Sequence, residues 1–284
     1  MGVRVPETSD AVEDRRRFGA ELRRLREQAG RTLDEAAARL ECSAAKISRI
    51  ETGQVAVRPL DLRELLDFYA VAGARRAAML AVSRQRGKRP DLDGVIYDGY
   101  NLYLGYEEEA GDIREYQPQW IPGLLQTREY AHALSLAAGS TPEVAERRVA
   151  LRMDRQALLL REKPPHLSVV IDETALRRPV AEPGLMAAQL RRLADAAGDP
   201  HVTVRVLPST AGMHPAQAGG FIILGFPRPE DPDVVYTDDL TEGRLTQDAD
   251  RVKQYLAAFD RVQELALAPA ESVQLIHEVA ESHP

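Results

Sequence analysis

The sequence has few of the residues that build disulfide scaffolds, thiolate metal clusters or membrane spans. Its 284 residues include a single cysteine, Cys42, so an internal disulfide and a thiolate zinc cluster are both excluded. No apolar run approaches the roughly 18 residues of a membrane span, so we expect no membrane association. The opening residues MGVRVPETSD lack an apolar segment, and we expect no signal peptide. Together these absences predict a cytoplasmic protein.

Sequence signatures of common enzymes are also missing. The chain contains no Gly-rich phosphate loop, no G-x-S-x-G motif and no histidine cluster at metal-ligand spacing. Its six histidines are scattered along the sequence. We therefore predict a protein that is not an enzyme and that uses no metal or cofactor.

Charge is distributed unevenly along the chain. Residues 1–90 contain 19 Lys and Arg against 13 Asp and Glu, a net charge of +6. The remaining 18 basic and 31 acidic residues give −13, so the overall −7 hides a basic first third. Such an asymmetry is typical of a polyanion-binding module joined to a second domain. A basic stretch broken by Gly87 and Pro90 predicts the boundary: a domain over 14–86, a linker over 87–98 and a second domain over 99–284.

Residues 32–51, TLDEAAARLECSAAKISRIE, predict two short helices joined by a tight turn. Thr32 is a good N-cap, and Glu35 three residues later completes a capping box. Ser43 is placed to cap the second helix, and Gly53 to end it in a left-handed turn. In the second helix Ile47 and Ile50 point inward, which leaves a mostly polar outward face. A capped helix pair with such a face is what insertion into a DNA major groove requires.

This stretch resembles the helix-turn-helix of the XRE (phage-repressor-like) regulators, over about Asp14 to Ala81. The matching residues lie in the helix pair and just before it: Leu22, Leu25, Arg26, Thr32, Leu33, Glu35, Ala37, Leu40, Ser43, Ile47, Ser48, Ile50, Glu51 and Gly53. The resemblance implies a five-helix, all-α, lambda-repressor-like domain with a buried ion pair between Arg26 and Glu51. At the turn position usually held by Gly stands Glu41, where a positive φ would cost on the order of 1 kcal/mol.

The outward face of the second helix carries the predicted contacts with double-stranded DNA. Arg49 is the candidate for direct readout, because a guanidinium binds O6 and N7 of guanine with two bonds. Lys46 is predicted to contact a base or a phosphate. The hydroxyls and backbone amides at Thr32 and Ser43 suit phosphates. The remaining members of this face are Ala44, Ala45 and Ser48. A single module of this size binds weakly, so we expect a homodimer on two half-sites.

The second region changes from helical to alternating patterns. It predicts helices over residues 100–116, 127–138, 141–161, 183–197 and 248–268, and a final helix ending at 280. It predicts strands over residues 166–172, 201–207, 221–226 and 234–237. The fold expected for this region is therefore α+β with a small mixed sheet.

This region resembles the C-terminal domain of actinomycete-type antitoxin-like regulators. The resemblance rests on the phrases YLGYEEEA, PGLLQTREYA, RQALL, DETALRRPV, QLRRL, VTVRVLPSTAG, GGF and VVYTDD. It implies a regulator whose second domain receives a signal from a small partner protein, often one encoded by the adjacent gene.

A small-molecule signal is the alternative. The loop 208–220 is long, rich in small residues and carries His214, and such loops often bind ligands. Together with Trp120, Asp172 and Glu173 it could line a pocket. Against this stand ordinary structural roles for each residue: packing for Trp120, a strand-end turn for the two carboxylates and solvent exposure for His214. A rival of another class is an enzyme or scaffold that merely carries a DNA-binding tether.

Overall fold

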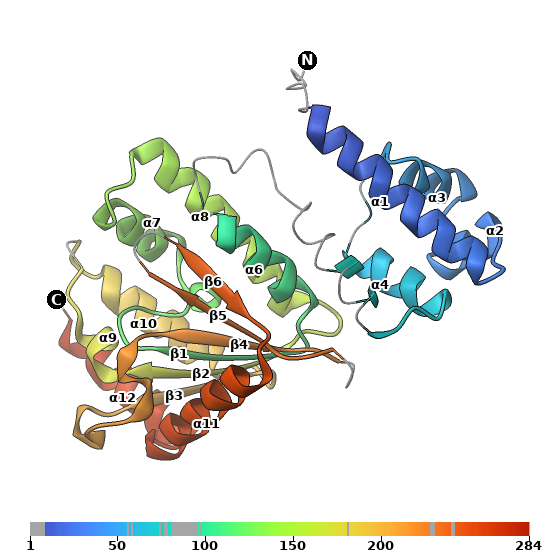
Figure 1. Ribbon diagram of the computed structural model, residues 1–284. Coiled ribbons are helices and arrows are strands. Elements are labelled where there is room, and N and C mark those ends of the chain that lie inside the picture. The colour runs from blue at the N-terminus through green and yellow to red at the C-terminus, as the bar shows by residue number, and fades with distance from the viewer. Residues whose placement is uncertain are drawn as a thin grey trace. The chain divides into compact units, whose positions relative to one another are not determined.

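The computed structural model describes residues 9–55, 57, 59–73, 75–76, 79–80, 96, 98–180, 182–227, 231–239 and 242–283. The chain divides into two compact units, residues 1–88 and 89–284 (Figure 1). Most of the predicted linker over 87–98, and most of residues 77–86 at the end of the predicted first domain, lie outside the described residues.

The first unit contains the helices α1 (Ser9–Gln28), α2 (Leu33–Arg39), α3 (Ala44–Glu51) and α4 (Pro59–Phe68). Helix α1 begins at Ser9, before residue 14 where the first domain was predicted to start, and Gly30 with a φ of +66° follows its end. Apolar side chains from all four helices and from the segment after α4 form one core cluster: Phe18, Leu22, Leu25, Ala36, Ala37, Ile47, Ile50, Leu62, Leu65, Leu66, Tyr69, Met79 and Leu80.

The caps predicted for α2 and α3 are confirmed. Thr32 accepts a hydrogen bond from the backbone N–H of Glu35 at 3.1 Å, and the Glu35 carboxylate accepts one from the Thr32 backbone at 2.8 Å. Ser43 accepts from the Lys46 backbone at 3.3 Å. The turn between the helices places Glu41 at a φ of +50°, so the departure from glycine stores strain on the order of 1 kcal/mol there.

Helix α1 crosses the end of α3 at a glycine. A Cβ atom at Gly19 would lie 2.5 Å from the Glu51 carbonyl oxygen and 2.6 Å from that of Ile50. Both are backbone atoms of α3, so any larger residue would push the two helices apart. This close approach sets how α3 is held against the rest of the unit.

The second unit is built on a six-stranded mixed sheet in the order β3-β2-β1-β4-β5-β6. Its strands are β1 (Asp112–Gln117), β2 (His166–Asp172), β3 (Val202–Leu207), β4 (Phe221–Gly225), β5 (Val234–Asp238) and β6 (Gly243–Thr246). Strands β1, β2 and β3 are parallel, whereas β4, β5 and β6 pair in antiparallel fashion. The α+β class is confirmed, with six strands in the sheet instead of the four predicted.

Helices cover both faces of this sheet (Figure 1). One face packs against α6 (Asp98–Glu109), α7 (Arg128–Ala137), α9 (Glu173–Arg177), α10 (Leu185–Ala196) and α12 (Pro269–Ser282). Helix α8 (Pro142–Gln156) packs on α7. The other face packs against α11 (Ala249–Leu265) through Val252, Phe259 and Val262. Thr127, Thr141 and Asp248 cap α7, α8 and α11.

The prediction of a single helix over 100–116 is wrong. Helix α6 ends at Glu109, and β1 begins at Asp112 in the middle of the sheet. The change occurs at Gly111, whose N–H donates to Gly225 and whose carbonyl accepts from His166. Two neighbouring strands therefore satisfy this backbone, and that tertiary pairing overrides the helical pattern of the flanking residues.

A buried ionic network lies between α6 and α8. The guanidinium of Arg155 donates from Nε to Glu107 Oε2 and from Nη2 to Oε1, both at 2.7 Å. The hydroxyls of Tyr100 and Tyr103 also bond to this pair. Because each buried charge has its partner, the network joins α6 to α8.

Glu115 on β1 is a buried carboxyl near this network. It is 3% exposed, and burial raises its pKa from 4.5 to about 7, against the lowering effect of a hydrogen bond from Gln117. The unfolded chain ionises Glu115 at lower pH than the folded protein does. The second unit therefore loses stability as pH rises from about 4.5 to about 7.

The substitution Glu115→Gln removes this ionisation. We expect it to raise the free energy of unfolding of the second unit at pH 8 by about 2 kcal/mol, and to have little effect at pH 4.5. Denaturant titrations followed by the fluorescence of Trp120, the single tryptophan, report on this unit. An equal effect at both pH values would contradict the assignment.

Candidate nucleic-acid interface

The outward face of α3 presents one exposed arginine. Arg49 and Ala45 are exposed, whereas Ile47 and Ile50 on the other side are buried. Arg49 Nε donates to the Ala45 carbonyl at 3.3 Å, which lays the side chain along the helix. No carboxylate among the described residues pairs with it. The side chain predicted to read bases therefore stands at the surface of α3.

The other predicted residues of this face are less exposed to solvent. Ala44 is half-buried and packs against the core. Lys46 is half-buried too, and its Nζ lies 2.8 Å from Asp61 Oδ2 on α4. Ser48 is half-buried, and its carbonyl accepts a hydrogen bond from the Thr52 hydroxyl at 2.9 Å.

The N-termini of α2 and α3 are capped by side chains at the start of each helix. Thr32 and Ser43 are used as caps, and each accepts a hydrogen bond from a backbone N–H within its own helix. The Ser43 hydroxyl can still donate, because a cap uses only an acceptor lone pair, whereas the Thr32 hydroxyl already donates to Glu35 Oε2 at 3.1 Å. An anion at either start is favoured by the positive end of the helix dipole.

A buried ion pair joins α1 to the end of α3. Arg26 donates from Nε to Glu51 Oε1 at 2.7 Å and from Nη2 to Oε2 at 3.0 Å. The two side chains are 9% and 4% exposed. Arg26 Nη1 also donates to the carbonyl of Arg31 at 2.8 Å, just before the α2 cap. One guanidinium therefore positions both helices of the pair, and Glu51 raises the pKa of Arg26 through its hydrogen bond.

The substitution Glu51→Ala tests this role. We expect it to lower the free energy of unfolding of the first unit by about 3 kcal/mol, because Arg26 is left charged and buried. Glu64→Ala is the control, since that carboxylate is partly exposed and pairs with Arg39 rather than with Arg26. Thermal unfolding followed by circular dichroism measures both variants. Equal, small effects of the two substitutions would contradict the role assigned to the pair.

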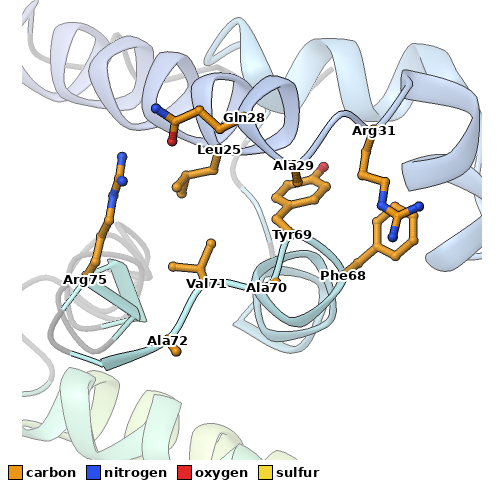
Figure 2. A pocket seen from close by; sticks show the side chains of 10 residues that line it. All are labelled: Leu25, Gln28, Ala29, Arg31, Phe68, Tyr69, Ala70, Val71, Ala72 and Arg75. Atoms are coloured by element: carbon orange, nitrogen blue, oxygen red, sulfur yellow. The ribbon is translucent and has the colours of Figure 1, made fainter.

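A groove of about 450 Å³ lies elsewhere in the first unit (Figure 2). It is lined by residues of α1, of the turn after it, of the α4 end and of the segment that follows: Leu25, Gln28, Ala29, Arg31, Phe68, Tyr69, Ala70, Val71, Ala72 and Arg75. The Arg31 guanidinium stacks 4.5 Å from the centre of the Phe68 ring, and Arg75 pairs with Glu21. None of the lining residues belongs to α3, so the groove is separate from the predicted DNA-reading face.

Three of the four predicted ligand residues lie at one edge of the sheet in the second unit. Asp172 ends β2 and caps α9, and Glu173 Oε2 accepts from the backbone and hydroxyl of Ser209 in the loop after β3. These bonds from Ser209, partly offset by burial, lower the pKa of Glu173, with Arg177 adding to the effect. Trp120 instead packs against the apolar cluster on the face covered by α6, α7 and α10.

His214 sits in the same loop and contacts β1. Its Nε2 lies 3.4 Å from the Tyr116 hydroxyl, and its buried Nδ1 has no hydrogen-bond partner among the described residues. Burial and the charge of Asp172 raise the pKa of Tyr116 to about 12. The sequence did not point to Tyr116 because its segment was predicted as helix. Ser209 was recognised only as part of the loop.

Two further features are absent from the described part of the chain. No helix there is long and apolar enough to cross a membrane. No three histidine, cysteine or carboxylate side chains within the same residues are grouped so that they could hold a metal ion.

Comparison with known protein families gives two matches. Residues 17–79 match the family described as "Helix-turn-helix domain". Residues 100–278 match the family described as "Domain of unknown function (DUF5753)". A search of curated proteins finds no match. The first match supports a DNA-binding regulator in general terms.

Proposed function

Because the chain belongs to the family of the domain of unknown function DUF5753 and carries a helix-turn-helix domain before it, we propose that it is a sequence-specific transcriptional regulator. The proposal is that α3 enters the major groove of operator DNA, while the second unit receives a signal. The resemblance of the first unit to XRE regulators supports the same assignment.

The observation that carries this proposal is the exposed Arg49 on a capped helix. A guanidinium gives two parallel hydrogen bonds to O6 and N7 of guanine, the commonest specific contact in the major groove. The small side chain of Ala45 lets the helix approach the base edges closely and contact a thymine methyl. With few long side chains on this face, DNA shape contributes the remaining selectivity.

The charge distribution also supports DNA binding by the first unit. Residues 1–90 carry a net charge of +6, and the rest of the chain −13. Affinity for phosphates therefore resides in the first unit and falls steeply as salt rises. Since a single helix-turn-helix module makes few contacts, we propose a homodimer on two half-sites about one DNA turn apart.

The second unit is proposed to bind a small partner protein, in the manner of antitoxin-like regulators. The resemblance of this region to such regulators and its net negative charge support a partner with a basic surface. Met213 is 89% exposed, and methionine is enriched in protein interfaces. Co-purification with the product of the adjacent gene tests this step, and a product that never co-purifies when co-expressed would contradict it.

The DNA-binding proposal is tested by selecting duplexes from a random library and measuring their affinity. We expect Arg49→Ala to weaken binding by about 10- to 100-fold and to relax the preference for one guanine. Arg23→Ala is the matched control, because Arg23 is an exposed arginine on α1 that already pairs with Glu27. Fluorescence anisotropy at several salt concentrations measures all three proteins.

Two results would contradict the assignment. One is that the intact protein selects no sequence from the library. The other is that Arg49→Ala and Arg23→Ala weaken specific binding equally, because α3 would then not be the reading helix.

A second candidate is a small-molecule signal at the carboxyl ends of β1, β2 and β3. In open sheets with parallel strands, ligands bind at the carboxyl ends of the strands, and the three parallel strands share that edge here. Asp172 and Glu173 stand at the end of β2, His214 contacts Tyr116 on β1, and the buried Nδ1 of His214 supports a ligand contact. The test is mass spectrometry of small molecules released from the purified protein. Release that is unchanged by His214→Ala would contradict this candidate.

A further inference from the structure

The two cations on the outward face of α3 differ in their surroundings. Lys46 Nζ lies 2.8 Å from Asp61 Oδ2, and the two side chains are 32% and 19% exposed. Arg49, one helical turn later, is exposed and bonds only to the Ala45 carbonyl among the described residues. One cation of the helix is therefore neutralised by α4 and the other is not.

The position of Asp61 favours a lasting pair. It lies in the first turn of α4, where the helix dipole stabilises a carboxylate. The partly shielded setting also reduces screening of the pair by salt, compared with the exposed pairs on α1. Asp61 thus holds the Lys46 ammonium against the protein.

This pair changes the electrostatics of DNA binding. Each lysine that neutralises a phosphate releases counterions and steepens the salt dependence of log K by about 0.9. A lysine held by a carboxylate releases no counterions. To reach a phosphate, Lys46 would have to leave the Asp61 carboxylate unpaired near the negatively charged DNA. The pair therefore subtracts one phosphate contact from an interface that would otherwise include it.

We propose that Asp61 sets the affinity of this protein for DNA by holding Lys46 away from the phosphate backbone. Asp61 is thus a negative determinant of sequence-independent binding, and Arg49 is left as the one cation of α3 that reads DNA. This inference rests on the proposed DNA-binding function and goes beyond it, because it concerns a residue outside the helix that enters the groove.

The test uses the full-length protein and a 20-base-pair duplex of arbitrary sequence, so no operator is needed. We expect Asp61→Asn to tighten binding by about 3- to 10-fold near 50 mM salt and to steepen the salt slope by about 0.9. Lys46→Gln alone is expected to change affinity less than twofold. In the double variant Asp61→Asn/Lys46→Gln the gain is lost, because it comes from the released lysine and not from a missing negative charge alone.

Glu27→Gln is the matched control, since it also removes one carboxylate of the first unit and frees Arg23 on the surface of α1. A gain in this control as large as that of Asp61→Asn would overturn the proposal. So would a Lys46→Gln variant that loses affinity and salt slope as Arg49→Gln does, because Lys46 would then contact DNA despite Asp61. An intact protein that does not bind the duplex at low salt would instead overturn the proposed function itself.

Discussion

The buried ion pair between Arg26 and Glu51 is the constraint on which the proposed DNA-reading surface depends. It joins α1 to the last residue of α3 and, through the Arg31 carbonyl, to the start of α2. The pair lies beside the crossing at Gly19, where α1 leaves no room for a side chain against the α3 backbone. A short helix such as α3 has little stability of its own, so its orientation comes from these contacts.

In the same unit, α3 carries two cationic side chains, and only one of them is exposed without a carboxylate partner among the described residues. Lys46 and Arg49 are three positions apart, yet α4 supplies a carboxylate to the first and not to the second. Specificity requires a directional contact, whereas unrestrained lysines add affinity for every sequence. A face with small residues, one held lysine and one exposed arginine is consistent with modest but selective binding.

In the second unit the central strand β1 organises what surrounds it. Its neighbour β2 is parallel to it and its neighbour β4 is antiparallel. Its side chains alternate between the apolar clusters on the two faces of the sheet. On one side Glu115 meets the network of Arg155 and Glu107, and on the other Tyr116 meets His214 at the carboxyl edge of the sheet. The second unit thus has buried charges on one face of the sheet, and a polar loop at the carboxyl ends of the parallel strands.

The sequence by itself determined the caps at Thr32 and Ser43, the inward and outward sides of α3, and the α+β class of the second unit. Each depends on residues within a few positions of one another, so local spacing carries the information. Tertiary structure alone decided that Asp61 holds Lys46, that residues 112–117 form a strand, and that Gly19 lies against α3. Each of these contacts joins residues that lie far apart in the sequence. Local spacing therefore does not predict which residues will be partners.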